Sequence, residues 1–105
     1  MKSEKALHSY TKNCARRNGC NFFKLECVGR AGFPDVLITR HGWCIFIELK
    51  SPTGAGRLHP RQLEMITELK SNGIETYVAN QPAEIDAIIA GLINREPRPL
   101  PVSLI

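Results

Sequence analysis

The sequence predicts an α/β protein in which a mixed sheet is flanked by helices, and two patterns support this. Apolar residues recur at helical spacing in three segments, which are residues 3–19, 60–73 and 82–92. Short apolar or alternating runs typical of strands occupy four others, which are residues 21–28, 34–39, 43–50 and 74–80. The expected order is therefore α-β-β-β-α-β-α, with helices on a mixed sheet.

Capping residues predict where the helices begin and end. Ser3 can cap the first helix, and Asn18-Gly19 is a good stop for it. Pro60 and Pro82 suit the first positions of the second and third helices. The chain thus contains a local start signal for each expected helix.

The strand segments differ in how deeply they should be buried. Residues 21–28 alternate between apolar and polar positions, as in a strand with one wetter face. Residues 34–39 and 43–50 are nearly continuous apolar runs, typical of buried strands, with only a short turn between them. These two strands should form an antiparallel hairpin.

Length and composition indicate one ordinary globular domain without a membrane segment. The chain has 105 residues, of which 43% are apolar and 23% charged. Residues 1–94 are expected to form the domain and residues 95–105 a proline-rich extended tail. Because no run spans a bilayer and the start lacks a signal peptide, we expect a cytoplasmic protein of a bacterial or phage-infected cell. The four cysteines form no C-x-x-C pair, which favours free thiols over a zinc site.

Charge is unevenly distributed along the chain. Residues 1–62 carry eleven Lys/Arg against four acids, whereas residues 63–105 carry three against six, which together give the net charge of +4. A basic half indicates a surface for a polyanion, most simply nucleic acid, although a solvated lysine-rich surface would look similar. The candidates for contacts to a phosphate backbone are Arg16, Arg17, Lys24, Arg30, Arg57 and Arg61.

Three charged residues interrupt the apolar hairpin. Side chains two apart on a strand share a face, so Glu48 and Lys50 should be neighbours. Asp35 opens the preceding strand, and the hairpin brings that start beside the end of the next strand. All three side chains should therefore converge on one place.

Two carboxylates at one place suit a hard divalent cation such as Mg²⁺ or Mn²⁺. The backbone carbonyl of Leu49 could complete such a shell, and Lys50 could orient a water or stabilise developing negative charge. Such a metal would favour phosphodiester hydrolysis. The alternative is an ordinary ion-pair cluster at a sheet edge, since E-x-K alone is common on exposed strands.

The same residues carry a resemblance to a known family. The pattern G-x-P-D, then E-L-K, then a glutamine opening a helix resembles the virus-type replication-repair nuclease (VRR-NUC) domain of the PD-(D/E)XK superfamily. The matching residues, with a glutamate of the first helix, are Glu4, Gly32, Pro34, Asp35, Glu48, Leu49, Lys50 and Gln62. The resemblance covers about residues 4–92, and its spacing is far more specific than a lone E-x-K.

This resemblance implies a restriction-endonuclease-like α-β-β-β-α-β core and a metal-dependent nuclease acting on DNA. Asp35 and Glu48 would be metal ligands, Lys50 the catalytic lysine, and Glu4 a further acid bound directly or through water. Gln62 would support the site or contact phosphate. Glu4 could instead only stabilise the helix dipole, and Gln62 could only cap its helix.

The remaining polar and aromatic residues have weaker claims. His8 and His41 are expected to be solvated, and His59, where the family usually has a serine-type cap, should cap the helix or face phosphate. Trp43 and Phe46 could stack on unpaired bases, although strand aromatics are more often core residues.

The expected substrate is structured DNA. So short a chain has little room for a sequence-reading domain, and phosphate contacts carry no base information. Stand-alone members of the family resemble phage-type Holliday-junction resolvases, which implies a homodimer with two active sites. A flap or single-strand nuclease, a restriction-type or RNA-directed nuclease, and a non-catalytic DNA-binding subunit on the same fold are the alternatives.

Overall fold

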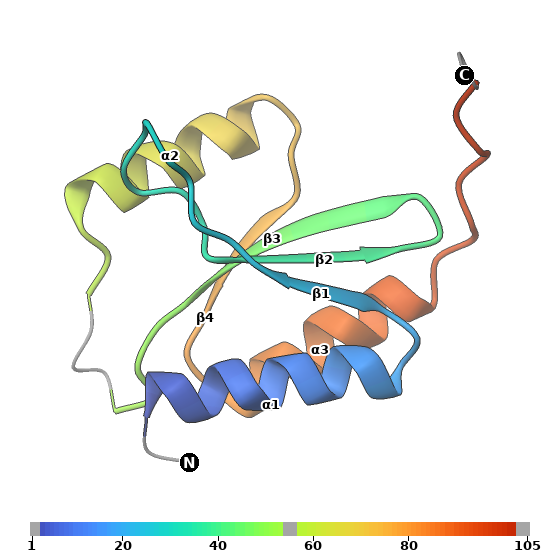
Figure 1. Ribbon diagram of the computed structural model, residues 1–105, viewed down its shortest axis with the longest axis horizontal. Coiled ribbons are helices and arrows are strands. Elements are labelled where there is room, and N and C mark those ends of the chain that lie inside the picture. Colours follow the sequence, from blue (N-terminus) through green and yellow to red (C-terminus); the bar gives the residue numbers. More distant parts are fainter. Residues whose placement is uncertain (1–2, 54–56, 103–105) are drawn as a thin grey trace.

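The computed structural model describes residues 3–53 and 57–102, and its elements follow the predicted order (Figure 1). They are α1 (Glu4–Arg17), β1 (Asn21–Lys24), β2 (Val36–Arg40), β3 (Trp43–Leu49), α2 (Pro60–Ser71), β4 (Thr76–Ala79) and α3 (Pro82–Ile93). The predicted α/β class is therefore confirmed. Ser3 caps α1 as expected, because its hydroxyl accepts a hydrogen bond from the Ala6 N–H at 3.0 Å.

The sheet is mixed, with strand order β1-β2-β3-β4. β1, β2 and β3 pair antiparallel, and β4 pairs parallel to β3 after the crossover through α2. The hairpin between β2 and β3 turns at His41 and Gly42, whose φ angles of 48° and 86° are both positive. Positive φ at both central residues matches the right-handed twist of the strands that they join.

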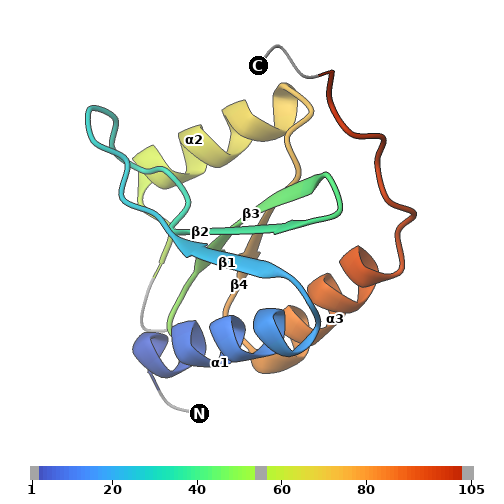
Figure 2. The ribbon, with the colours of Figure 1, turned by 45° about the vertical axis from the view of Figure 1, so that its right-hand side comes forward.

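Helices cover both faces of the sheet (Figures 1 and 2). α1 and α3 share one face, where Leu7 and Ile85 are fully buried against the strand residues Ile38, Ile45 and Ile47. α2 lies on the opposite face. Along β3 the buried Ile45, Ile47 and Leu49 alternate with Cys44, Phe46 and Glu48, as predicted. The sheet thus directs its apolar side chains to α1 and α3, and Glu48 to the side of α2.

The first strand is shorter than the sequence predicts. It ends at Lys24, and one further backbone bond joins the Leu25 N–H to the Asp35 carbonyl at 2.8 Å. Residues 28–32 form bends and turns that return the chain toward α2. Residues 26–28 therefore have no strand beside them to pair with, so their alternating pattern does not produce a strand.

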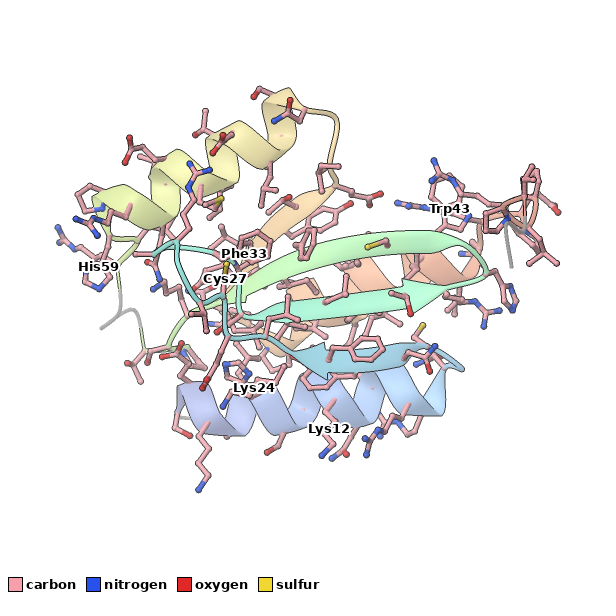
Figure 3. All side chains as sticks on the ribbon, turned by 45° about the horizontal axis from the view of Figure 1, so that its top comes forward. Lys12, Lys24, Cys27, Phe33, Trp43 and His59 are labelled. Carbon is pink, nitrogen blue, oxygen red and sulfur yellow. The ribbon has the colours of Figure 1, made fainter. Side chains whose placement is uncertain are left out.

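The start of the C-terminal tail packs on the hairpin end. The Trp43 indole N–H donates to the Glu96 carbonyl at 2.9 Å, and the Arg98 N–H donates to the His41 carbonyl at 2.9 Å. The guanidinium groups of Arg95 and Arg98 lie 4.7 Å and 4.2 Å from the Trp43 ring centroid. Trp43, at the end of the molecule away from His59, is thus covered by the chain itself (Figure 3).

The cysteines lie both in the core and at the surface. All four cysteines are free, with Cys14 and Cys20 buried and Cys27 and Cys44 exposed. Among residues 3–53 and 57–102, no helix is both long and apolar enough to cross a membrane.

A glycine brings the loop after β1 into direct contact with α2. Gly32 has a φ of 90°, and a Cβ atom built on it would lie 2.4 Å from the Arg61 carbonyl oxygen and 2.9 Å from the Gln62 nitrogen. Only glycine gives both the positive φ and the close backbone approach. The loop that leads into Asp35 is therefore pressed against the first turn of α2.

We expect Gly32→Ala to destabilise the fold more than Gly29→Ala. Both glycines have positive φ, which costs alanine about 1–2 kcal/mol, but a Cβ at Gly29 meets no atom within 4 Å. The difference between the two variants in the free energy of unfolding, measured by urea denaturation, isolates the contact with α2. Equal losses would mean that the loop moves away from α2 without cost.

Candidate active site

Asp35, Glu48 and Lys50 meet where β3 ends, as the hairpin predicts. An Asp35 carboxylate oxygen accepts a hydrogen bond from the Leu49 N–H at 3.2 Å, which places Asp35 between Glu48 and Lys50 along the strand. The Lys50 ammonium lies 3.5 Å from a Glu48 carboxylate oxygen. Glu48 is almost fully buried, with 3% of its surface exposed. The three charges are therefore neighbours in a largely water-excluded place.

Gln62, at the start of α2, connects this group to the helix. Its amide N–H donates to Glu48 at 3.1 Å, and its carbonyl oxygen accepts from the Lys50 ammonium at 2.8 Å. The same oxygen accepts from the His59 backbone N–H at 2.9 Å. Because two donors point at one oxygen, the orientation of the amide is determined. Gln62 thus both caps α2 and holds the acid and the lysine.

Burial and neighbouring acids raise the pKa of Glu48 to about 7. Removal from water disfavours the charged carboxylate, and the negative charges of Asp35 and Glu4 act in the same direction. Lys50 opposes them without cancelling them. The ionised form of Glu48 is therefore disfavoured at this site unless a further positive charge joins it.

A second group of ligand atoms adjoins this one. One ligand atom each from Glu4, His8 and Asp35 lie within 4.8 Å of one another. The His8 Nε2 atom is 3.1 Å from the second Asp35 oxygen, and only 17% of the His8 side chain is exposed. Asp35 is thus held on one oxygen by β3 and on the other by α1. The N-terminal end of α1 lies beside the end of β3 in both ribbon views.

The expectation that His8 is solvated is wrong. His8 follows Glu4 by one helical turn, so both side chains lie on the same face of α1. This i, i+4 spacing was the available signal, but the sequence alone does not show that the face packs beside Asp35. Within the described residues, the buried His8 Nδ1 has no hydrogen-bond partner. The expectation for His41 agrees with its exposed place in the turn.

Comparisons with known proteins agree with this geometry. The sequence model of the VRR-NUC domain matches residues 3–82. This chain belongs to the VRR-NUC family. A solved structure described as a VRR_NUC domain is 25% identical, with a TM-score of 0.76, and the match covers 86% of this chain and 97% of that one. Another, described as a VRR_NUC domain protein, shares the fold at 20% identity and a TM-score of 0.69, covering 87% and 88%. No curated protein matches the sequence.

The VRR-NUC domain has a nuclease-type fold, and its motif residues in this chain gather at one end of the sheet. Asp35 precedes β2, Glu48 lies near the end of β3, Lys50 follows it, and Gln62 is in the first turn of α2. Glu4, the first residue of α1, joins them through Asp35. The roles of these five residues, and of the Leu49 carbonyl, remain predictions that their proximity supports.

The acids of this VRR-NUC site have the chemistry that a divalent cation requires. Burial raises the pKa of Glu48 most, and the nearby carboxylates of Asp35 and Glu4 raise it further. Carboxylate oxygens are the preferred ligands of Mg²⁺ and Mn²⁺. The residues present therefore fit the group that the family implies.

The six basic residues predicted to contact DNA do not all surround the site. Arg16 and Arg17 end α1, roughly 18 Å from Glu4 at the rise of an α-helix. Lys24 pairs across the sheet with the residue after Asp35. Arg57 and Arg61 flank the start of α2, and Arg30, paired with Glu68, lines a cavity with Arg61.

We expect ionised Glu48 to destabilise the metal-free fold. Its pKa is 4.5 ordinarily and about 7 in the folded chain, so the folded state holds the proton more tightly. The contribution of Glu48 to stability is therefore fully present below pH 4.5, and it is lost as the pH rises through 7. One pKa unit corresponds to about 1.4 kcal/mol, so the loss is up to about 3 kcal/mol.

The measurement is urea denaturation between pH 5 and pH 8 of the wild type and Glu48→Gln, both without metal. The variant should lose less stability across this range, because its amide does not ionise. Excess MgCl₂ should stabilise the wild type most at the higher pH. Parallel pH profiles of the two proteins would contradict the raised pKa.

Proposed function

We propose that this VRR-NUC chain is a divalent-metal-dependent DNA endonuclease that hydrolyses phosphodiester bonds in branched DNA. The observation that carries the proposal is the meeting of Asp35, Glu48, Lys50 and Gln62, which three separate segments bring to one place. An ordinary ion pair at a sheet edge needs neither a buried glutamate nor a glutamine that holds both partners.

We assign different roles in the reaction to the side chains at this site. Asp35 and Glu48 would hold the cation, with Glu4 and the Leu49 carbonyl as further oxygen ligands. His8 keeps Asp35 in position from the side of α1. Lys50, directed by the Gln62 carbonyl, can stabilise the negative charge that develops on the phosphate or orient the attacking water.

Mg²⁺ or Mn²⁺, when bound, supplies Lewis acidity toward a phosphoryl oxygen and lowers the pKa of a coordinated water. Burial, and then the negative charge of Asp35, disfavour the ionised form of Glu48. A cation beside these carboxylates would offset both effects, which supports its binding here.

Branched DNA is the proposed substrate because the basic residues near the site would contact phosphates, which carry no base information. Lys24 ends β1 opposite the residue that follows Asp35, and Arg57 and Arg61 flank the start of α2; these three residues would position the backbone. Resolution of a four-way junction requires two cuts related by two-fold symmetry, which a homodimer supplies. We therefore propose a homodimeric junction-resolving nuclease.

Lys50→Met should lower DNA cleavage by at least about 10²-fold, the usual scale for a group that assists proton transfer. Junction affinity should change little, because one of many positive charges is removed. The substrates are a labelled four-way junction, a 5′ flap, a single strand and a linear duplex, each with Mg²⁺ or Mn²⁺. Lys12→Met, which removes an exposed lysine of α1, is the control.

Paired symmetric nicks in the junction alone, lost in Lys50→Met and retained in Lys12→Met, would support the resolvase. Cleavage of flaps or single strands instead would support nuclease activity and contradict junction resolution. Tight junction binding without cleavage of any substrate would make the protein a binding subunit.

The homodimer is tested by light scattering. The chain mass is 11.7 kDa, and we expect a species of about twice that mass, with and without junction DNA. A monomer that nevertheless cuts both strands symmetrically would contradict the dimer.

A further inference from the structure

A cavity adjoins the candidate active site and is lined by none of its acids. It has a volume of about 520 Å³ and lies between residues 31–33, in the loop before β2, and residues 59–62, at the start of α2. Cavities of this size hold small organic ligands. The close approach of Gly32 to Arg61 fixes the two walls relative to each other.

Both walls of the cavity continue into the site. Gln62 lines the cavity and also hydrogen-bonds Glu48 and Lys50. Phe33 lines the other wall and is followed by Pro34 and Asp35. A group that occupied the cavity would therefore belong to the nucleotide whose phosphate lies at the site, or to its neighbour.

The cavity offers a fixed aromatic ring. Phe33 is half-buried and packs edge-to-face on Phe46, with ring centroids 5.2 Å apart and an interplanar angle of 83°. This contact restrains the ring while leaving part of its surface to the cavity. Figure 3 shows His59 at one end of the molecule and Phe33 between it and Trp43, whose ring at the other end is covered by Arg95 and Arg98.

The charge of the cavity suits a nucleotide. Arg61 and His59 line it, and none of the residues that line it is acidic. The neighbouring cavity of about 280 Å³ contains Glu64, and a cavity of about 440 Å³ next to β4 contains Glu75. Acids in those two cavities would repel a phosphate. The Phe33 cavity thus combines an aromatic ring, a basic residue and a direct connection to the site.

We propose that the Phe33 cavity receives an unpaired nucleobase of the DNA, adjacent to the phosphate that is cleaved. This inference rests on the proposed function. Release of a base from a continuous duplex breaks its pair and its stacking, and the cost is lowest where pairing or stacking is already weakened. A branch point, where the stack of bases is interrupted, is such a place. The cavity would therefore favour branch points over duplex and place the cut next to the displaced base.

The experiment measures fluorescence anisotropy of a labelled four-way junction. Binding is measured in the Glu48→Gln background, so that cleavage does not interfere. Single abasic sites replace, one at a time, the nucleotides beside the cleavage position that the wild type defines. The variants are Phe33→Ala, Phe33→Leu, which keeps the bulk of the side chain, and Phe33→Trp, which keeps an aromatic face.

At one position, an abasic site should weaken binding roughly tenfold, the scale of one stacked base. Phe33→Ala and Phe33→Leu should weaken binding of the intact junction to the same extent, and the abasic site should then have no further effect. In Phe33→Trp, the abasic site should still weaken junction binding. Phe23→Ala, which removes an exposed aromatic ring of β1 outside the cavity, should behave like the parent protein.

Additive losses from the abasic site and the Phe33 variants would overturn the inference, as would equal affinity for every abasic junction. Cleavage by the wild type is scored separately. A protein that cleaves junctions but ignores abasic sites would therefore retain the proposed function and lose only this inference. Failure to bind any junction would overturn both.

Discussion

The side-chain amide of Gln62 is the contact on which the geometry of the site depends. Its carbonyl oxygen accepts hydrogen bonds from the His59 N–H and the Lys50 ammonium, and its nitrogen donates to Glu48. Met65 and Ile66 are the buried residues of α2, and neither belongs to the main core. The position of α2 over the site therefore rests on these two side chains together with the Gln62 amide and the close approach at Gly32.

Glu48 shows a conflict between stability and chemistry. Complete burial of a carboxylate beside two other acids disfavours its ionised form, which raises its pKa to about 7. The same surroundings make the site attractive to a cation. Perturbed groups of this kind are common at functional sites, which supports the proposal that Glu48 binds the cation.

Much of the fold could be predicted because its signals are local. The Ser3 cap, the prolines that begin α2 and α3, and the His41-Gly42 turn each act within a few residues. The failures depend on distant neighbours. Residues 26–28 alternate like a strand but have no strand beside them, and His8 lies against Asp35 from a distant segment instead of facing solvent.

The sequence by itself determined the order of elements and the convergence of Asp35, Glu48 and Lys50, because hairpin pairing and strand alternation are matters of spacing. Only the tertiary structure decided which face of α1 meets Asp35, how Gln62 joins two charges, and that Phe33 lines a cavity. These depend on how helices and a loop pack across the sheet. Packing brings together residues whose separation along the chain carries no information about their distance in space.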